Sequence, residues 1–247
     1  MTRGYRTGPV LKRRDQVPSS THDQRLLDTQ DSADWLHTDP WRVMRIQSEF
    51  VDGFGTLAEL GPAVSVFGSA RTGPGNPIYE AGVAVGRALV ESGYAVITGG
   101  GPGAMEAANR GAVEADGLSV GLGIELPRES GLNEFVDLGV NFRYFFVRKT
   151  MFLKYAQGFI VLPGGLGTLD ELFEALTLVQ TGKVTRFPIV LIGSQFWAGL
   201  LAWLRDKCVA EGMIHADDLD LLYLTDDVQD AVDFIVAARE NRIGNGG

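Results

Sequence analysis

The sequence predicts an α/β fold: a mostly parallel sheet with helices on both faces, preceded by an N-terminal helical extension. Apolar β-forming runs alternate with segments of helical spacing from residue 61 onward, which is typical of βα units. Glycine makes up 32 of 247 residues, near twice the usual ~7%, and much of it follows predicted strands. This length suits one α/β domain with an appendage, so we expect an extension over 1–60 and a main domain over 61–247.

The extension begins with about 30 polar residues that lack a sustained period, so we expect little fixed structure there. Residues 1–14 hold basic side chains and no acid, which indicates a solvated tail more than a partner-binding segment. Asp39-Pro40 then predicts a helix N-cap followed by a first-turn proline. The next apolar residues recur at spacings of three and four: Val43, Ile46, Phe50, Phe54 and Leu57. We expect an amphipathic helix that docks on the main domain or on a second subunit.

The main domain alternates between strand and helix patterns. Short apolar runs predict strands at 63–67, 94–98, 118–126, 159–162, 189–192 and 221–224. Helical spacing predicts helices at 78–90, 104–115, 145–157, 169–180, 196–211 and 227–240. Between the third strand and the third helix, residues 127–143 are expected to form a long polar connection, which is a kind of segment that often carries function.

The glycine turn after the strand at 159–162 organises the rest of the chain. It has the sequence Pro163-Gly-Gly-Leu-Gly-Thr168 and leads into a helix. Glycines let the backbone approach a ligand closely, and a helix N-terminus favours an anion such as phosphate. An alternative is structural, because Thr168 and Glu171 also fit a capping box at the start of that helix.

Two further glycine turns follow the first and second predicted strands, at 68–71 and 99–103. The carboxyl ends of parallel strands share one edge of a sheet, and ligands bind there near the switch in strand order. The coincidence of three such turns predicts a site for a phosphorylated small molecule. The candidate residues in the two earlier turns are Ser69, Arg71, Gly101 and Gly103.

Composition argues against several classes of protein. The formal net charge of −9 disfavours a nucleic-acid surface, which needs a concentrated basic face. The single cysteine, Cys208, cannot form an internal disulfide, and its apolar helical context indicates a core thiol. No apolar segment follows the basic start and none approaches ~18 residues, so we expect a cytoplasmic protein without a membrane span.

Familiar catalytic motifs are also missing from the sequence. His22, His37 and His215 make no metal-ligand spacing, so no metal is expected. There is neither a Gly-x-Ser-x-Gly elbow nor a Walker pattern. Gly99-x-Gly101-x-x-Ala104, with Glu125 about 20 residues on, matches the dinucleotide fingerprint, but it follows the second strand instead of the first. One mononucleotide held between two loops is the more economical interpretation.

Charged side chains remain near this edge. Arg148-Lys149 lies in an otherwise apolar, aromatic helix, which indicates either snorkelling cations or a site for an anion or carboxylate. Arg148 precedes the central strand and Glu171 follows it, so the two can face each other across the end of that strand. This pairing favours function. The other charged residues within reach are Arg71, Glu106, Glu129 and Asp170.

These motifs together resemble the Lonely Guy family of cytokinin-activating phosphoribohydrolases, long labelled possible lysine decarboxylases. The resemblance rests on Arg148-Lys149 and Pro163-Gly-Gly-Leu-Gly-Thr-Leu-Asp-Glu171, with Phe67-Gly-Ser-Ala-Arg71 and Gly99-Gly-Gly-Pro-Gly-Ala-Met105 upstream, and it covers about residues 60–240. It implies a Rossmann-like fold that hydrolyses an N⁶-modified AMP, or AMP itself, to free base and ribose 5-phosphate, without a cofactor.

The resemblance also assigns residues. The catalytic pair falls on Arg148 and Glu171, and a substrate-contacting acid falls on Glu129. Further substrate contacts implied in the glycine loop and around it are Gly164, Gly165, Gly167, Thr168, Asp170, Lys149 and Thr177. The chain departs from many members at Phe146, where they carry His. The N-terminal extension resembles the longer subgroup, which implies a homo-oligomer built from dimers, up to a hexamer.

The implied chemistry suits these side chains. Cleavage of C1′–N9 builds positive charge on the ribose, which the Glu171 carboxylate can stabilise while it orients or deprotonates water. Arg148 stays protonated, so its role is electrostatic. Two alternatives remain open. One is a non-catalytic nucleotide-binding module; the other is a pyridoxal phosphate decarboxylase, which needs a Schiff-base lysine, and no lysine here follows a histidine.

Overall fold

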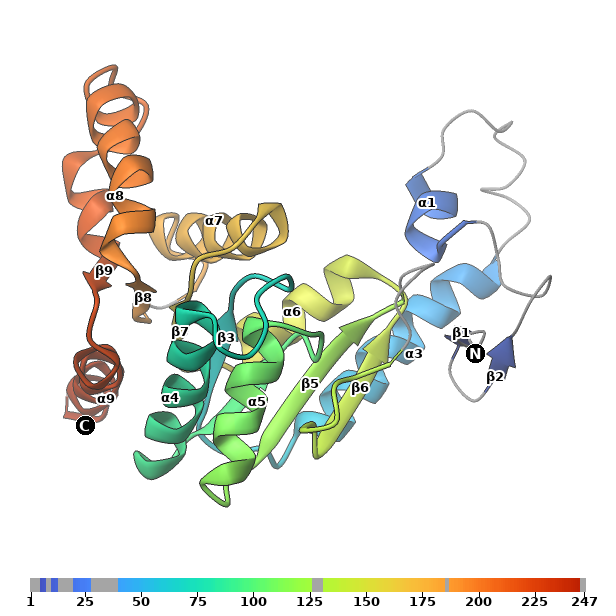
Figure 1. The fold of residues 1–247 in the computed structure, drawn as a ribbon. Helices are drawn as coiled ribbons and strands as arrows, with labels where there is room; N and C mark the ends of the chain where they lie inside the picture. The colour runs from blue at the N-terminus through green and yellow to red at the C-terminus, as the bar shows by residue number, and fades with distance from the viewer. Residues whose placement is uncertain are drawn as a thin grey trace.

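The computed structural model describes residues 5–7, 10–12, 20–27, 40–125, 131–184 and 187–244. Within these ranges, seven parallel strands form one sheet in the order β6-β5-β4-β3-β7-β8-β9 (Figure 1). Their bounds are β3 (Ala63–Phe67), β4 (Ala95–Thr98), β5 (Ser119–Ile124), β6 (Leu138–Phe142), β7 (Phe159–Val161), β8 (Ile189–Ile192) and β9 (Leu222–Thr225). The predicted α/β fold with a parallel sheet is confirmed.

Helices cover both faces of this sheet, as the continuous apolar strands require. On one face lie α3 (Pro40–Leu57), α6 (Phe145–Tyr155), α7 (Leu166–Gln180) and α8 (Ser194–Trp203). On the other lie α4 (Pro77–Glu91), α5 (Ala104–Glu114) and α9 (Val228–Gly244) (Figure 1). Successive side chains of β3 divide between the two cores: Phe67 packs among the first group of helices, and Val66 among the second.

The order of strands reverses between β3 and β7, which are neighbours in the sheet although their paired residues Val66 and Ile160 are 94 positions apart in the sequence. From β3 the chain proceeds through β4, β5 and β6 to one edge, whereas β7, β8 and β9 proceed to the other. The segments that follow β3 and β7 therefore lead toward opposite edges of the sheet from adjacent starting points. Parallel α/β sheets bind their ligands at such a switch point.

Helices α4 and α5 pack unusually closely through glycine. A methyl group added at Gly86 would overlap the backbone carbonyl of Ala108, and one added at Gly111 would overlap that of Val83. Neither obstacle is the flexible end of a side chain, so the backbones themselves would have to separate. These two glycines set the distance between the helices.

The described residues of the N-terminal region include regular secondary structure that the sequence did not indicate. Within residues 1–30 the structure describes an antiparallel pair, β1 (Tyr5–Thr7) with β2 (Val10–Lys12), and helix α1 (His22–Leu27). The expectation of little fixed structure is thus wrong for these segments. The predicted helix α3 is present, while Asp39, its expected N-cap, lies outside the described residues. Three of the residues in its predicted apolar stripe pack on the main core: Ile46, Phe50 and Leu57.

The predicted elements of the main domain differ from the structure at three places. Residues 138–142 form strand β6, in a stretch that was expected to be a polar connection. Helix α7 begins at Leu166, three residues before the predicted start. Helix α8 ends at Trp203 and continues as a π-helical turn over Leu204–Val209, which contains the half-buried Cys208; a 3₁₀ segment, Ala216–Leu221, precedes β9.

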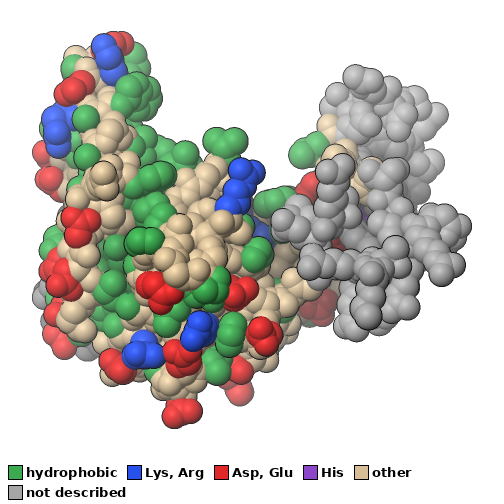
Figure 2. Space-filling view, in the orientation of Figure 1, with side chains coloured by type: hydrophobic (Ala, Val, Ile, Leu, Met, Phe, Trp, Pro, Cys, Tyr) green, Lys and Arg blue, Asp and Glu red, His purple; other side chains and the backbone are tan. Residues whose placement is uncertain are grey.

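The surface agrees with the charge pattern of the sequence. On the face shown in Figure 2, Lys and Arg side chains are scattered among acidic ones and form no continuous basic stripe. Among the described helices, none combines the length and the apolar character that a membrane crossing needs.

The contact between α4 and α5 gives a stability prediction. Gly86→Ala should destabilise the protein by about 2 kcal/mol, because the added methyl group overpacks the helix pair. The matched control is Gly199→Ala in α8, where a methyl group meets nothing within 4 Å, so better helix propensity should leave stability equal or raise it by up to ~1 kcal/mol. Thermal and urea unfolding of both variants measure this, and equal effects would contradict the packing argument.

Candidate active site

Three turns meet at Ser69, which follows β3. The backbone N–H of Ser69 donates to the carbonyl of Pro163 after β7, at 3.1 Å, and its carbonyl accepts from the N–H of Ala104 at the start of α5, at 2.8 Å. Glycines make this approach possible: a side chain at Gly103 would overlap the backbone of Ser69 and Ala70, and one at Gly164 would overlap Thr168. The three predicted glycine turns therefore form one continuous structure.

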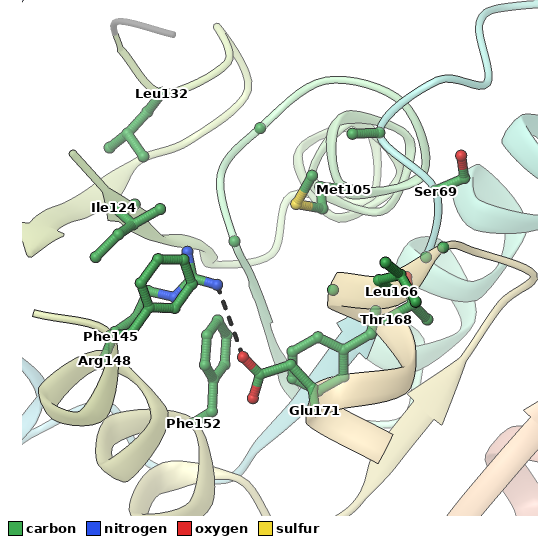
Figure 3. Close-up of a pocket in the computed structure, with 18 of the residues that line it drawn as sticks. Ser69, Met105, Ile124, Leu132, Phe145, Arg148, Phe152, Leu166, Thr168 and Glu171 are labelled. Atoms are coloured by element: carbon green, nitrogen blue, oxygen red, sulfur yellow. Dashed lines mark ion pairs between the residues drawn. The ribbon is translucent and has the colours of Figure 1, made fainter. Parts of the chain in front are cut away.

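A cavity of about 650 Å³ opens beside these turns (Figure 3). Of the residues predicted from the sequence, it is lined by Ser69, Arg71, Gly101, Arg148, Gly165, Gly167, Thr168 and Glu171. One end is formed by the glycine turns, and the other by apolar side chains from β5, α6 and the segment that follows Gly131. A site with one polar and one apolar end suits a ligand that combines an anionic group with an aromatic one.

The N-terminus of α7 lines this cavity through Gly165, Leu166, Gly167 and Thr168. The helix begins at Leu166 with Gly165 as N-cap, and no side chain caps it. The first N–H groups of a helix have no partner within the helix, so those of Leu166, Gly167 and Thr168 are available to an anion. The capping-box alternative is wrong, because the earlier helix start places Thr168 in the first turn and Glu171 in the second. The Glu171 side chain is free for another role.

Arg148 and Glu171 face each other across the end of the central strand β7, as the sequence predicted. Arg148 Nη2 lies 3.7 Å from Glu171 Oε1, and the side chains are 14% and 7% exposed. The guanidinium packs against the rings of Phe145 and Phe152, at 5.1 and 5.5 Å from their centroids. Figure 3 shows the pair between the apolar and glycine-rich ends. The rings restrain the cation through packing and cation–π attraction.

Burial dominates the electrostatics of this pair. Loss of water raises the pKa of Glu171 to about 7, although the positive charges of Arg148 and Lys149 act to lower it. Burial likewise lowers the pKa of the Arg148 guanidinium, against the opposing effect of Glu171. The Nε atom of Arg148 is buried and has no hydrogen-bond partner among the described residues. A buried donor of this kind is costly to leave unpaired, which makes it a candidate contact for a ligand.

Lys149 points away from the cavity and links α6 to α7. Its Nζ lies 2.8 Å from Asp170 Oδ2 and 2.5 Å from Glu174 Oε2. Burial alone would lower the pKa of Lys149, but hydrogen bonds to these two carboxylates outweigh it and raise that pKa. The adjacent cations thus divide the two roles that the sequence left open: Arg148 lines the cavity, and Lys149 joins two helices.

Other predicted site residues lie outside the lining. Lys149, Asp170, Gly103 and Gly164 surround the cavity without lining it, and Thr177 is exposed farther along α7, donating to the Phe173 carbonyl. Glu129 lies outside the described residues. Phe146 does not line the cavity either; its ring packs against Tyr144.

The apolar end of the cavity was missed by sequence reasoning. It comes from Met105, Ile124, Leu132, Phe145 and Phe152, and the polar Asn141 also lines the cavity. Leu132 sits in a slot bordered by Gly100, Gly121 and Gly139, where added side chains would meet its methyl groups. The signal was present, since a run of small residues on neighbouring strands indicates that something packs closely there. This signal could not be used from the sequence, because residues 138–142 were assigned to a connection and Gly139 was therefore not placed beside β5.

Two other acidic residues considered in the sequence analysis, Glu125 and Glu106, contact side chains of the protein itself. Glu125, which the dinucleotide fingerprint would place on a ribose, is buried beside Arg143 and His22, at 3.7 and 3.3 Å. Glu106 accepts a hydrogen bond from Tyr79 Oη. In the part of the chain that the structure describes, no three His, Cys, Asp or Glu side chains gather in a way that could hold a metal ion.

Solved structures share this fold. The molybdenum cofactor carrier protein from Chlamydomonas reinhardtii superposes with a TM-score of 0.55 at 22% identity, over 72% of this chain and 98% of that one. A molybdenum cofactor binding protein from Rippkaea orientalis gives a TM-score of 0.53 at 20% identity, over 71% and 96%. At these identities the similarity shows the fold alone.

Sequence comparison is more specific. Residues 105–235 match the family model described as possible lysine decarboxylase. A probable cytokinin riboside 5′-monophosphate phosphoribohydrolase of Oryza sativa subsp. japonica is 32% identical over 70% of this chain and 76% of its own length. A cytokinin riboside 5′-monophosphate phosphoribohydrolase of Mycobacterium tuberculosis is 32% identical over 63% and 83%. The model match and these relatives show that the chain belongs to the Lonely Guy family.

Proposed function

We propose that the chain is a phosphoribohydrolase that cleaves cytokinin riboside 5′-monophosphates, or AMP itself, into free base and ribose 5-phosphate. The observation that carries the proposal is the buried Arg148–Glu171 pair, which lies in the cavity beside the uncapped N-terminus of α7. The names of the curated relatives support the same reaction.

In this proposal the 5′-phosphate binds at the glycine-rich end. The free N–H groups at the start of α7 and the positive end of its macrodipole favour the dianion. Ser69 and Arg71 line the same end and can add a hydroxyl and a positive charge. Binding energy gained here, away from the reacting bond, holds the ribose in place for cleavage.

The ribose then lies beside Glu171. As the C1′–N9 bond breaks, its electron pair goes to the base and positive charge develops on the sugar ring, which an adjacent carboxylate stabilises. Water adds to C1′ and gives a proton to Glu171, and the departing base takes up a proton from solvent. Glu171 then releases its proton to solvent, so the net change is the addition of one water. A carboxyl group with a pKa of about 7 is well matched to accept a proton near neutral pH.

Arg148 acts without a proton transfer. Its charge favours the ionised form of Glu171, and its buried Nε donor is available to the nucleotide. The apolar end of the cavity, with Ile124, Leu132 and Phe145, supports a base that carries an apolar N⁶ substituent. No lysine is among the lining residues that the structure describes, which gives no support to Schiff-base chemistry in this cavity.

Glu171→Gln tests the catalytic assignment. The amide preserves the shape of the side chain but can neither carry the charge nor take a proton, so turnover should fall by about 10³-fold or more while nucleotide binding changes little. Base release from N⁶-isopentenyl-AMP, AMP and their unphosphorylated ribosides is measured by chromatography, and binding by calorimetry. Asp206→Asn, an exposed acid outside the cavity lining, is the matched control and should keep most of the rate.

Three results would contradict parts of this proposal. Full activity in Glu171→Gln would remove that residue from the mechanism. Equal rates for ribosides and monophosphates would contradict a phosphate site at α7. Tight nucleotide binding by the wild-type chain with no base release from any substrate would favour a non-catalytic nucleotide-binding module.

The pH dependence follows from the raised pKa of Glu171. If the ionised carboxylate is the active form, kcat/KM should rise with pH and level off above about 7, the pKa of this group. One unit below that pKa, about a tenth of the carboxylate is ionised, so the rate should be about tenfold lower. In Arg148→Gln the charge that lowers this pKa is gone, so the rising limb should move to higher pH. A rate that falls as pH rises through 7 would instead indicate that Glu171 acts as an acid.

We also propose that the chain forms a homo-oligomer through the outer side of α3. There Trp41, Met44 and Val51 are exposed, although the opposite side of the helix packs on the core through Ile46, Phe50 and Leu57. Adjacent apolar side chains at a surface mark protein contacts. Light scattering should give a mass above that of one chain, and Val51→Glu with Met44→Glu should lower it. A monomeric wild-type chain would contradict the proposal.

A further inference from the structure

Three successive backbone N–H groups, those of the two residues before α6 and of its first residue, donate to carboxylates of the N-terminal extension. The N–H of Arg143 lies 3.1 Å from each oxygen of Glu49, on α3, and the N–H of Tyr144 lies 3.3 Å from Glu49 Oε2. The N–H of Phe145 lies 3.2 Å from Asp23 Oδ2, on α1. The acceptors are thus 94 to 122 residues earlier in the chain than their donors.

Helix α6 has no cap of its own. Its N-cap residue, Tyr144, makes no side-chain capping bond, and its first turn contains no acid. A helix N-terminus presents unpaired N–H groups and a partial positive charge, which nearby carboxylates satisfy. The local sequence therefore provides no side-chain acceptor for the N–H groups that begin α6, and carboxylates of the extension accept their hydrogen bonds instead.

A second set of contacts holds the same junction. Glu49 is buried, and one of its oxygens also lies 3.2 Å from Arg143 Nη1. Arg143 in turn lies beside Glu125 at the end of β5, and Glu125 lies beside His22 of α1. The ring of His22 packs edge-on against Tyr144. Charged side chains of α1, of α3 and of the residue after β5 thus meet where the chain enters α6. They form one network, so loss of one contact should weaken the others.

The pair of the proposed active site depends on that turn. The N–H of Arg148 donates to the carbonyl of Tyr144 at 3.2 Å, so Arg148 lies one turn beyond the capped residues. Its guanidinium packs on Phe145, whose own N–H is the one that Asp23 accepts. Asp23 is also near enough to act electrostatically on Arg148. A shift of the first turn would move the guanidinium relative to Glu171.

We propose that the N-terminal extension positions the arginine of the active site: Glu49 and Asp23 cap α6 and thereby fix Arg148 against Glu171. Both are positioning residues, since neither lines the cavity. The inference rests on the proposed function for its effect on rate, whereas the capping itself does not depend on any reaction.

The test compares Asp23→Ala with Asp23→Asn. Alanine removes the acceptor, whereas asparagine caps helices about as well as aspartate. Loss of a cap is worth about a factor of five, so kcat should fall by about fivefold in Asp23→Ala and recover most of that loss in Asp23→Asn. KM for the nucleotide monophosphate should change by less than about twofold, because the phosphate end of the cavity lies on α7. Asp52→Ala, an exposed acid of α3, is the matched control.

Hydrogen exchange supplies a readout that needs no turnover. In Asp23→Ala the amides of residues 143–148 should exchange faster, while those of the central strands β3 and β7 keep their protection. Glu49→Gln should show the same pattern more strongly; if its burial makes that variant unfold, the half-buried Asp23 still decides the question.

The outcomes separate the two proposals. If Asp23→Ala keeps both the wild-type kcat and the wild-type exchange at α6, the positioning role is wrong. It is equally wrong if kcat falls while exchange at α6 is unchanged, or if Asp23→Asn loses as much as Asp23→Ala. If the wild-type chain releases no base at all, the proposed function fails, and exchange at α6 still decides whether the extension caps the helix.

Discussion

The reversal of strand order between β3 and β7 is the constraint on which the other features of the cavity depend. Because connections leave this point in opposite directions, no helix can cover it, and the turns after the two strands are left to meet at Ser69. Glycine is required there by space, since a side chain at Gly103 or Gly164 would overlap the neighbouring turn. The cavity is thus a consequence of topology, and its polar end is made mainly of backbone.

The chemistry of the site comes from what the flanking helices add to that backbone. Helix α6 precedes β7 and α7 follows it, so Arg148 and Glu171 reach the same opening from opposite sides. Burial makes the charge of the pair depend on pH near neutrality, because it raises the pKa of Glu171 to about 7 while the positive charge of Arg148 limits the rise. The neighbouring pair of Lys149 with Asp170 stays outside the cavity and fixes the two helices to each other. Arg148 therefore contributes to the site, and the adjacent Lys149 contributes to the contact between the two helices that carry it.

The sequence predicted the sheet and its glycine edge well because local signals specify both. The strand Phe159–Val161 is apolar and contains two β-branched residues, and the glycines that follow it are typical of a turn between strand and helix. Prediction failed where a distant partner decides the outcome. Residues 138–142 form an edge strand only because β5 pairs with them, and α7 starts at Leu166 although Thr168 and Glu171 match a capping box. Asp23 and Glu49 gave no signal at all, since their partners lie about a hundred residues away.

The close packing of Leu132 against glycines limits where the size of the apolar end can vary. Its methyl groups occupy the space that side chains at Gly100, Gly121 and Gly139 would need, so β5, β6 and the turn after β4 cannot carry larger residues at these positions. The size of the apolar end can therefore vary through Leu132 while these glycines stay unchanged. A smaller side chain at position 132 would enlarge that end of the cavity without any change in the sheet.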